Sequence, residues 1–268
     1  DMDIAKKLID VAKIAGCDAV KFQKRDIEKV YSKEVLDSPR DSPWGKTQRE
    51  QKLGLEFTEK DFKIIDNYCK KKKIDWYLSC WDIGSQIQMR KFETKYNKIA
   101  SAMLIHQKLL ETVAQEKKYT FISTGMSTMK DITKAVNIFK KYDCPFELMH
   151  SHSAYPMSLK ESNLKLITTL QKKFKCKVGY SGHEASSYFV CVCAAMLGAS
   201  SIERHITLSR AMYGSDQSAS IEPAALNTLV GAVRKIEMAM GDGQKLVLDS
   251  EVPIAKKLRG HLKWEASE

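Results

Sequence analysis

The sequence predicts an α/β protein folded as a (β/α)8 TIM barrel that lacks its first strand in this chain. Short apolar runs alternate with helical patterns, which is typical of βαβ units around a parallel sheet. The first regular segment is a helix, and the seven strand-like runs that follow are one fewer than a complete barrel needs. A doubly wound sheet is the alternative, but no glycine-rich phosphate loop follows the first strand.

The N-terminal segment begins with apolar residues at helical spacing from Ile4 to Ala15, with Asp3 as the expected cap and Gly16 as the terminating glycine. Residues 19–23 are short, apolar and β-branched enough for a buried strand. Residues 25–55 are polar and contain two Ser-Pro breaks, so we expect a long loop there. Loops of this length inside a compact domain usually have a function.

The rest of the chain alternates regularly. Thr58 with Asp61, and Thr128 with Asp131, are capping pairs that begin helices. Further helical patterns span 83–92, 109–114, 132–139, 164–174, 188–197 and 224–240, the last ending at Gly241. We expect a barrel domain over residues 1–250. The strand-like runs begin near Trp76, Lys98, Thr120, Phe146, Lys177 and Ser200.

The composition limits the class of protein. A chain of 268 residues with 43% hydrophobic residues can bury a large core. No apolar run is long enough to span a membrane and no signal-peptide pattern opens the chain, so we predict a soluble cytoplasmic protein with its seven cysteines reduced. The formal charge of +11 suggests an anionic ligand. No nucleic-acid-binding motif accompanies it in the sequence, so a small anion is favoured over nucleic acid.

Two neighbouring strand-like runs each end in a histidine, His183 and His205. If the two strands are adjacent and parallel, both imidazoles emerge at the same edge of the sheet. Neutral imidazoles there can hold a divalent metal and leave its other positions to water and substrate. Two ordinary histidines at strand ends are the alternative.

Hydroxyl and ammonium groups recur at the expected carboxyl ends of the strands, where a barrel places its active site. Such a ring of donors suits carboxylate and phosphate oxygens. Lysines inside a barrel strand also need a partner or a ligand. These residues are Lys21, Ser79, Lys98, Ser101, Ser123, Ser151, Ser153 and Ser181.

Two other interpretations of these residues stay open. Lys21 or Lys98 can act as a Schiff-base nucleophile, as in a class I aldolase. His150 and His152 share one face of a strand, which is an arrangement that hydrolytic metal barrels use. Those barrels typically carry the pair on their first strand, so this is the second choice for a metal site.

Six motifs in order resemble the sialic acid synthase family: KIASAM, STGM, SAYP, YSGHE, IERHITL and GSDQSASIEP. The resemblance extends from the first helix to Leu258. It implies a TIM-barrel enzyme that condenses phosphoenolpyruvate with an open-chain N-acyl amino sugar, a mannosamine-type aldose or its 6-phosphate. The products would be a sialic acid-like nonulosonate and phosphate.

The resemblance also implies roles for individual residues. His183 and His205 would ligate Mn²⁺ or Mg²⁺, which polarises the aldehyde and holds the attacking water. Tyr155 and Asp216 would face the acceptor sugar and that water, so the catalytic group would comprise these four residues. The residues matching phosphoenolpyruvate-binding positions are Lys21, Ser79, Lys98, Ser101, Ser123, Ser153 and Ser181.

The sequence departs from the family pattern in three places. The first strand, with an acidic residue near the metal, is absent, and Met103 replaces an acidic residue that contacts the acceptor in many members. Residues 251–268 resemble only the approach to an antifreeze-like domain that is missing. A homodimer is the expected assembly, with small-molecule substrates and neither membrane nor nucleic acid as partners. A barrel that binds sugar phosphates without turnover is the non-enzymatic alternative.

Overall fold

The computed structural model describes residues 1–185 and 188–262. Its main sheet has seven parallel strands in the order β1-β4-β5-β6-β7-β8-β9, so each strand after β1 lies beside the one before it in the sheet. The predicted α/β class is therefore confirmed. The strands are β1 (Ala19–Lys24), β4 (Asp75–Cys80), β5 (Tyr96–Ile99), β6 (Tyr119–Ser123), β7 (Phe146–Ser151), β8 (Val178–Gly182) and β9 (Ile202–Arg204).

The sheet curls so that its two edge strands approach each other. Lys21 on β1 forms an ion pair of 2.7 Å with Glu203 on β9, although no backbone pairing joins these strands among the described residues. Such closure is the geometry of a barrel opened along one seam. An eighth strand that would complete the ring stays a prediction.

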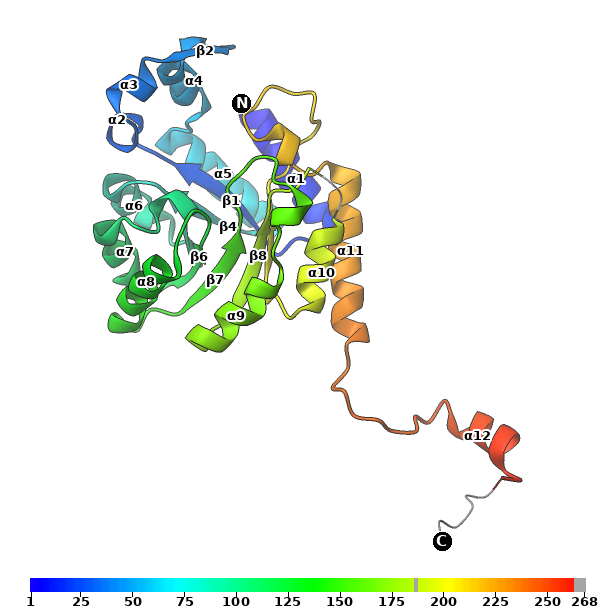
Figure 1. The fold of residues 1–268 in the computed structure, drawn as a ribbon. Helices are drawn as coiled ribbons and strands as arrows, with labels where there is room; N and C mark the ends of the chain where they lie inside the picture. Colours follow the sequence, from blue (N-terminus) through cyan, green and yellow to red (C-terminus); the bar gives the residue numbers. More distant parts are fainter. Residues whose placement is uncertain (186–187, 263–268) are drawn as a thin grey trace.

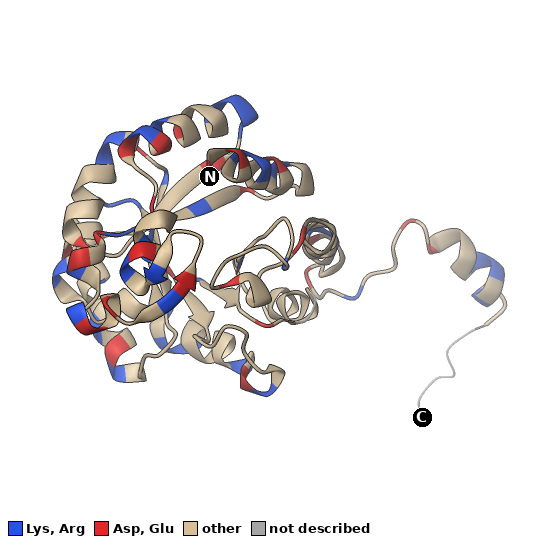
Figure 2. Ribbon diagram, turned by 90° about the horizontal axis from the view of Figure 1, so that it is seen from above, with Lys and Arg blue, Asp and Glu red and all other residues tan. Residues whose placement is uncertain are grey.

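Helices cover the outer face of the curled sheet (Figure 1). Figure 2 shows Lys and Arg distributed over these helices and interspersed with Asp and Glu, as on an ordinary solvated surface. No helix in the described part of the chain is both long and apolar enough to cross a membrane. The covering helices are α1 (Met2–Ala15), α5 (Glu59–Lys72), α6 (Ile83–Met89), α7 (Gln107–Ala114), α8 (Met129–Lys141), α9 (Lys165–Phe174), α10 (Phe189–Met196) and α11 (Pro223–Ala239).

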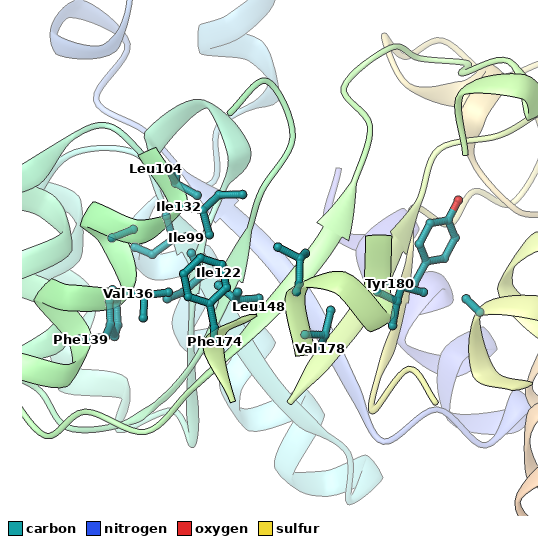
Figure 3. Close-up of a cluster of buried hydrophobic side chains, with 14 of the residues drawn as sticks. Ile99, Leu104, Ile122, Ile132, Val136, Phe139, Leu148, Phe174, Val178 and Tyr180 are labelled. Carbon is teal, nitrogen blue, oxygen red and sulfur yellow. The ribbon is translucent and has the colours of Figure 1, made fainter. Parts of the chain in front are cut away.

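The alternation of side chains along each strand divides the sheet into two faces. On the outer face, Leu148, Val178 and Tyr180 are buried together with apolar residues of α7, α8 and α9 (Figure 3). Each fully buried aliphatic or aromatic side chain stabilises the fold by about 1.5–3 kcal/mol relative to exposure. A second cluster, which includes Ile9, Phe62 and Trp76, joins α1 and α5 to the sheet.

The inner face of the sheet carries polar side chains at the carboxyl ends of the strands. It carries aromatic side chains nearer to their amino ends. Tyr77 lies 5.6 Å from Phe121 between ring centroids, and Tyr96 lies 5.5 Å from the same ring. Below them Glu147 accepts a hydrogen bond of 2.8 Å from Tyr119. The aromatic rings pack together on the inner face, and the predicted site residues of the described strands lie closer to the polar, carboxyl end of the sheet.

The segment 25–55 was predicted as a loop, and this prediction was wrong. It contains two single-turn helices, α2 (Ile27–Val30) and α3 (Lys33–Leu36), the hairpin of β2 (Pro39–Ser42) and β3 (Gly45–Thr47), and α4 (Gln48–Leu55), which projects from one end of the sheet with them (Figure 1). Local capping interactions stabilise these short helices. Thr47 and Glu50, for example, form a capping box at the start of α4. In so short a stretch, a capping pair is a weak signal for a helix.

Helix boundaries differ from prediction by a few residues. The cap of α1 is Asp1, whose carboxylate accepts from the backbone N–H groups of Asp3 and Ile4, rather than Asp3. The final long helix, α11, ends with Met240 as its C-cap, one residue before the predicted Gly241. Both predicted capping boxes, at Thr58 and Thr128, are confirmed.

The tail after α11 contains a short helix, α12 (Val252–Arg259), which lies apart from the sheet (Figure 1). The predicted domain boundary at residue 250 falls within the irregular stretch between the two helices. Residues 263–268 of the predicted tail lie outside the described residues. The assignment of this tail as an approach to another domain stays a prediction.

Candidate active site

The site residues come from the inner face of the sheet at its open end. In a parallel sheet, residues in register point to the same face, and Ser151, Ser181 and Glu203 form one such row across β7, β8 and β9. Ser79 and Lys98 form a second row across β4 and β5. The fold thus brings together side chains that are more than a hundred residues apart in sequence.

Glu203 joins the two predicted lysines at the centre of the site. Its Oε1 lies 2.7 Å from Lys21 Nζ, and its Oε2 lies 3.0 Å from Lys98 Nζ. Lys98 is only 2% exposed, so its ammonium depends on this carboxylate for compensation. Ser181 Oγ donates a hydrogen bond of 3.2 Å to the same Oε1.

The charges of this cluster shift the protonation equilibria of Glu203 and Lys98. Burial opposes ionisation of Glu203, but Lys21 and Lys98 outweigh it and hold the pKa of this carboxyl well below its usual range. Burial lowers the pKa of Lys98 to about 8, opposed by Glu203 and assisted by Lys21. At neutral pH Glu203 is therefore ionised, and Lys98 is still mostly protonated.

Serine hydroxyls and one glycine form a cradle beside this charge cluster. The backbone N–H of Gly125 donates to Ser101 Oγ and to Ser151 Oγ, each at 3.1 Å. A Cβ on Gly125 would lie 2.3 Å from Ser153 Oγ and 2.8 Å from Ser101 Oγ, so only glycine permits this close approach. Ser123 is also buried, at the end of β6. Among residues 1–185 and 188–262, the Oγ atoms of Ser79 and Ser153 are buried without hydrogen-bond partners, and such groups are donors available to a ligand.

His183 and His205 follow β8 and β9 directly, and the structure places them side by side. Their ring centroids are 5.3 Å apart, and the Tyr155 ring lies 4.2 Å from His183 and 5.5 Å from His205. Burial is the main cause that lowers the pKa of each imidazole to about 4. Both rings are therefore neutral at physiological pH. Burial also raises the pKa of Tyr155 to about 12, so its phenol stays protonated.

The donor set suits a divalent metal in part. His183 Nδ1 is hydrogen-bonded to the carbonyl oxygen of His152, so a metal would bind at Nε2, which Ser181 Oγ approaches at 3.5 Å. His205 Nδ1 faces Asp216 Oδ2 at 3.4 Å. Within residues 1–185 and 188–262, however, no group of three or more His, Cys, Asp or Glu side chains has metal-binding geometry. Two neutral imidazoles are thus the available protein ligands, and water or substrate would complete the coordination.

The structure separates the two histidines of the competing pair, because β7 includes His150 and ends before His152. His150 is in register with Tyr180 on the face that packs against the helices, and its Nε2 is 2.8 Å from the carbonyl oxygen of Ser162. His152 follows the strand, and its carbonyl supports His183. Because His150 points away from the polar inner face, the pair does not converge on the site.

Glu203 was not predicted as a site residue, although it lies within the motif IERHITL and buried lysines need partners. The available signal was its position in the strand-like run that ends at His205, two residues before that predicted metal ligand. Gly125, within the motif STGM, was likewise not predicted as part of the site.

Comparison with known proteins agrees with this arrangement. The model of the NeuB family matches residues 8–245. N-acetylneuraminate-9-phosphate synthase of Mus musculus is 35% identical over 261 residues, which cover 96% of this chain and 72% of that protein. N,N'-diacetyllegionaminic acid synthase of Campylobacter jejuni is 33% identical over 257 residues, covering 94% and 77%.

A solved structure supports the same relation. The sialic acid synthetase of Leptospira borgpetersenii, determined in complex with citrate, superposes with a TM-score of 0.84 at 29% identity and covers 98% of this chain and 87% of that one. The predicted resemblance to sialic acid synthases is thus confirmed, and with it the prediction of an enzyme. The curled parallel sheet, the cluster of lysine, glutamate and serine, and these matches lead to one conclusion: the chain belongs to the NeuB family.

Proposed function

We propose that this chain condenses phosphoenolpyruvate with the aldehyde of an open-chain N-acyl amino sugar. A bond forms between the methylene carbon of phosphoenolpyruvate and the aldehyde carbon, water adds to the enol carbon, and phosphate leaves with C–O cleavage. The aldehyde oxygen takes up a proton, so the products are a nonulosonate and inorganic phosphate. The names of the relatives, which are synthases of sialic and legionaminic acids, support this reaction class.

The observation that carries the proposal is the cluster of Lys21, Lys98 and Glu203 beside unpartnered serine hydroxyls. Two ammonium groups against one carboxylate leave a net positive charge, which suits a small trianion. In the proposed complex, the two lysines and the serines bind the phosphate and carboxylate groups, and the buried walls exclude water from the enol. Lys98 and Glu203 would fix the orientation of the bound substrate.

The two imidazoles are assigned to the acceptor end. If Mn²⁺ or Mg²⁺ binds at His183 and His205, it supplies a Lewis acid for the aldehyde. Asp216 would orient the acceptor beside His205, and Tyr155 would cover both rings. An eighth strand, a homodimer and a cytoplasmic location remain parts of this proposal.

A Schiff-base aldolase is the second candidate, because the lowered pKa of Lys98 is a feature that such enzymes use. One experiment separates the two candidates. Phosphate release from phosphoenolpyruvate is measured against a panel of N-acyl hexosamines, with added Mn²⁺ and with EDTA. We expect metal-dependent release with at least one sugar. Borohydride trapping of pyruvate on Lys98, together with turnover indifferent to EDTA, would instead establish the aldolase.

The pH dependence of phosphoenolpyruvate use tests the role of Lys98. As pH rises through about 8, the buried ammonium loses its proton and with it the positive charge that attracts phosphate. We therefore expect kcat/KM for phosphoenolpyruvate to fall above this pH, since this parameter reports groups of the free enzyme. In Lys98→Arg the decline should disappear, because a guanidinium stays protonated. An unchanged alkaline limb in Lys98→Arg would exclude this role.

A further inference from the structure

A cleft opens beside the acceptor end of the site. It lies between the loop after β9 and the segment 25–55, and the two walls are joined by Tyr213, whose hydroxyl donates to the carbonyl oxygen of Asp41 at 3.2 Å. The rings of Trp44 and Tyr213 pack edge to face at 5.8 Å. The cleft has a volume of about 530 Å³, within the range that holds small ligands, and it meets the site at His205 and Asp216.

Three cations line this cleft: Arg25, Arg40 and Lys52. Arg25 is neutralised by Glu56, whose Oε1 accepts from its Nε at 2.7 Å. No such compensation exists for the other two. In the part of the chain that the structure describes, no carboxylate lies within 4.0 Å of the charged group of Arg40 or Lys52.

Lys52 is the more informative of the two unpaired cations. Its side chain is half-buried, and its ammonium lies 4.4 Å above the ring of Tyr31, an attractive contact that supplies no hydrogen-bond acceptor. Burial first, and then the like charges of Arg25 and Arg40, lower its pKa, and the carboxylate of Asp216, which also lines the cleft, opposes them only in part. Like charges gathered at a partly desolvated wall are unfavourable unless an anion binds between them.

We propose that Arg40 and Lys52 bind the terminal phosphate of a phosphorylated acceptor sugar, whose aldehyde end lies at His205 and Asp216. The inference rests on the proposed function and names its substrate class. The phosphate of phosphoenolpyruvate has its own cations at Lys21 and Lys98, so this second anion site needs a second anion.

The number of carbon atoms in the substrates and the product relates the phosphate of the acceptor to that of the product. A nine-carbon product takes three carbons from phosphoenolpyruvate and six from the acceptor, so a phosphate on carbon 6 of the sugar becomes a 9-phosphate. Overall identity does not select this acceptor, because relatives named for a 9-phosphate and for legionaminic acid are 35% and 33% identical to the chain. The unpaired cations Arg40 and Lys52 favour the phosphorylated acceptor.

The test compares N-acetylmannosamine with its 6-phosphate in the full-length chain. We expect kcat/KM for the phosphorylated sugar to exceed that for the neutral sugar. In Lys52→Gln it should fall by about 10- to 100-fold, the effect of losing one charge-assisted hydrogen bond. The KM for phosphoenolpyruvate and the activity with the neutral sugar should not change. The matched control is Lys33→Gln, an exposed lysine of the same segment outside the cleft.

Two results would overturn the inference: a wild-type preference for the neutral sugar, or an equal loss for both sugars in Lys52→Gln. If no sugar supports phosphate release, the proposed function fails. The phosphate site is then tested separately, by calorimetric measurement of sugar phosphate binding. Binding of N-acetylmannosamine 6-phosphate that Lys52→Gln weakens and Lys33→Gln does not would support the phosphate site. Absence of binding to the wild type would refute it.

Discussion

Replacement of Glu203 with glutamine is expected to lower the free energy of unfolding by about 3–5 kcal/mol, the cost of leaving buried charges unpaired. Glutamine keeps the size of the side chain but removes the charge that compensates Lys21 and Lys98, of which Lys98 is only 2% exposed. Urea denaturation followed by circular dichroism measures the change. Phosphoenolpyruvate binding should change as well, because both ammonium groups lose their fixed orientation.

Two further variants identify the cause of that loss. Glu237→Gln removes an exposed partner of Arg234 and should leave stability within about 0.5 kcal/mol of the wild type. The double variant Lys98→Met/Glu203→Gln should be more stable than Glu203→Gln alone, because it removes one of the two unpaired ammonium groups. If the single variant unfolds at the wild-type urea concentration, Glu203 does not compensate the lysines.

Features encoded locally were predictable. The capping boxes at Thr58 and Thr128 depend on residues three positions apart, and both were found where predicted. The strand order followed from the alternation of strands and helices, because sequential βαβ units place successive strands side by side. The position of His183 beside His205 followed from the same rule.

Contacts that depend on the curl of the whole sheet were harder to predict. Lys21 and Glu203 are 182 residues apart and lie on the two edge strands, so their pairing follows from the curl of the sheet and not from any local pattern. His150 shows the opposite difficulty. Its spacing from His152 predicted a shared face of one strand, but β7 ends at Ser151, and the face of the sheet that carries His150 packs against helices.

The segment 25–55 was misjudged for a related reason. Its helices and strands are too short to produce a periodic signal, and contacts such as that of Tyr213 with Asp41 hold it against a distant loop. The length of the segment predicted a functional role, which stays a prediction. The proposed phosphate site would give such a role to Arg40 and Lys52.

His183→Ala is expected to have the largest effect on metal binding. The hydrogen bond from His183 Nδ1 to the carbonyl oxygen of His152 fixes the ring, and the pKa of about 4 keeps it neutral, so Nε2 would be a preorganised ligand in the proposed metal site. We expect the affinity for Mn²⁺, measured by calorimetry, to fall by at least about 100-fold, the upper size of the effect of losing an outer-shell partner alone. Phosphate release should also lose its dependence on Mn²⁺.

The matched control for that experiment is His106→Ala, which removes an exposed histidine at the N-terminus of α7. It should bind Mn²⁺ as the wild type does, and so should His150→Ala if its fold survives, because His150 faces the helices. Wild-type Mn²⁺ affinity in His183→Ala would contradict the assignment. Loss of Mn²⁺ binding in His150→Ala with an intact fold would move the metal to the opposite face of the sheet. The calorimetric measurement does not need turnover, so it tests the pair of imidazoles independently of the acceptor sugar.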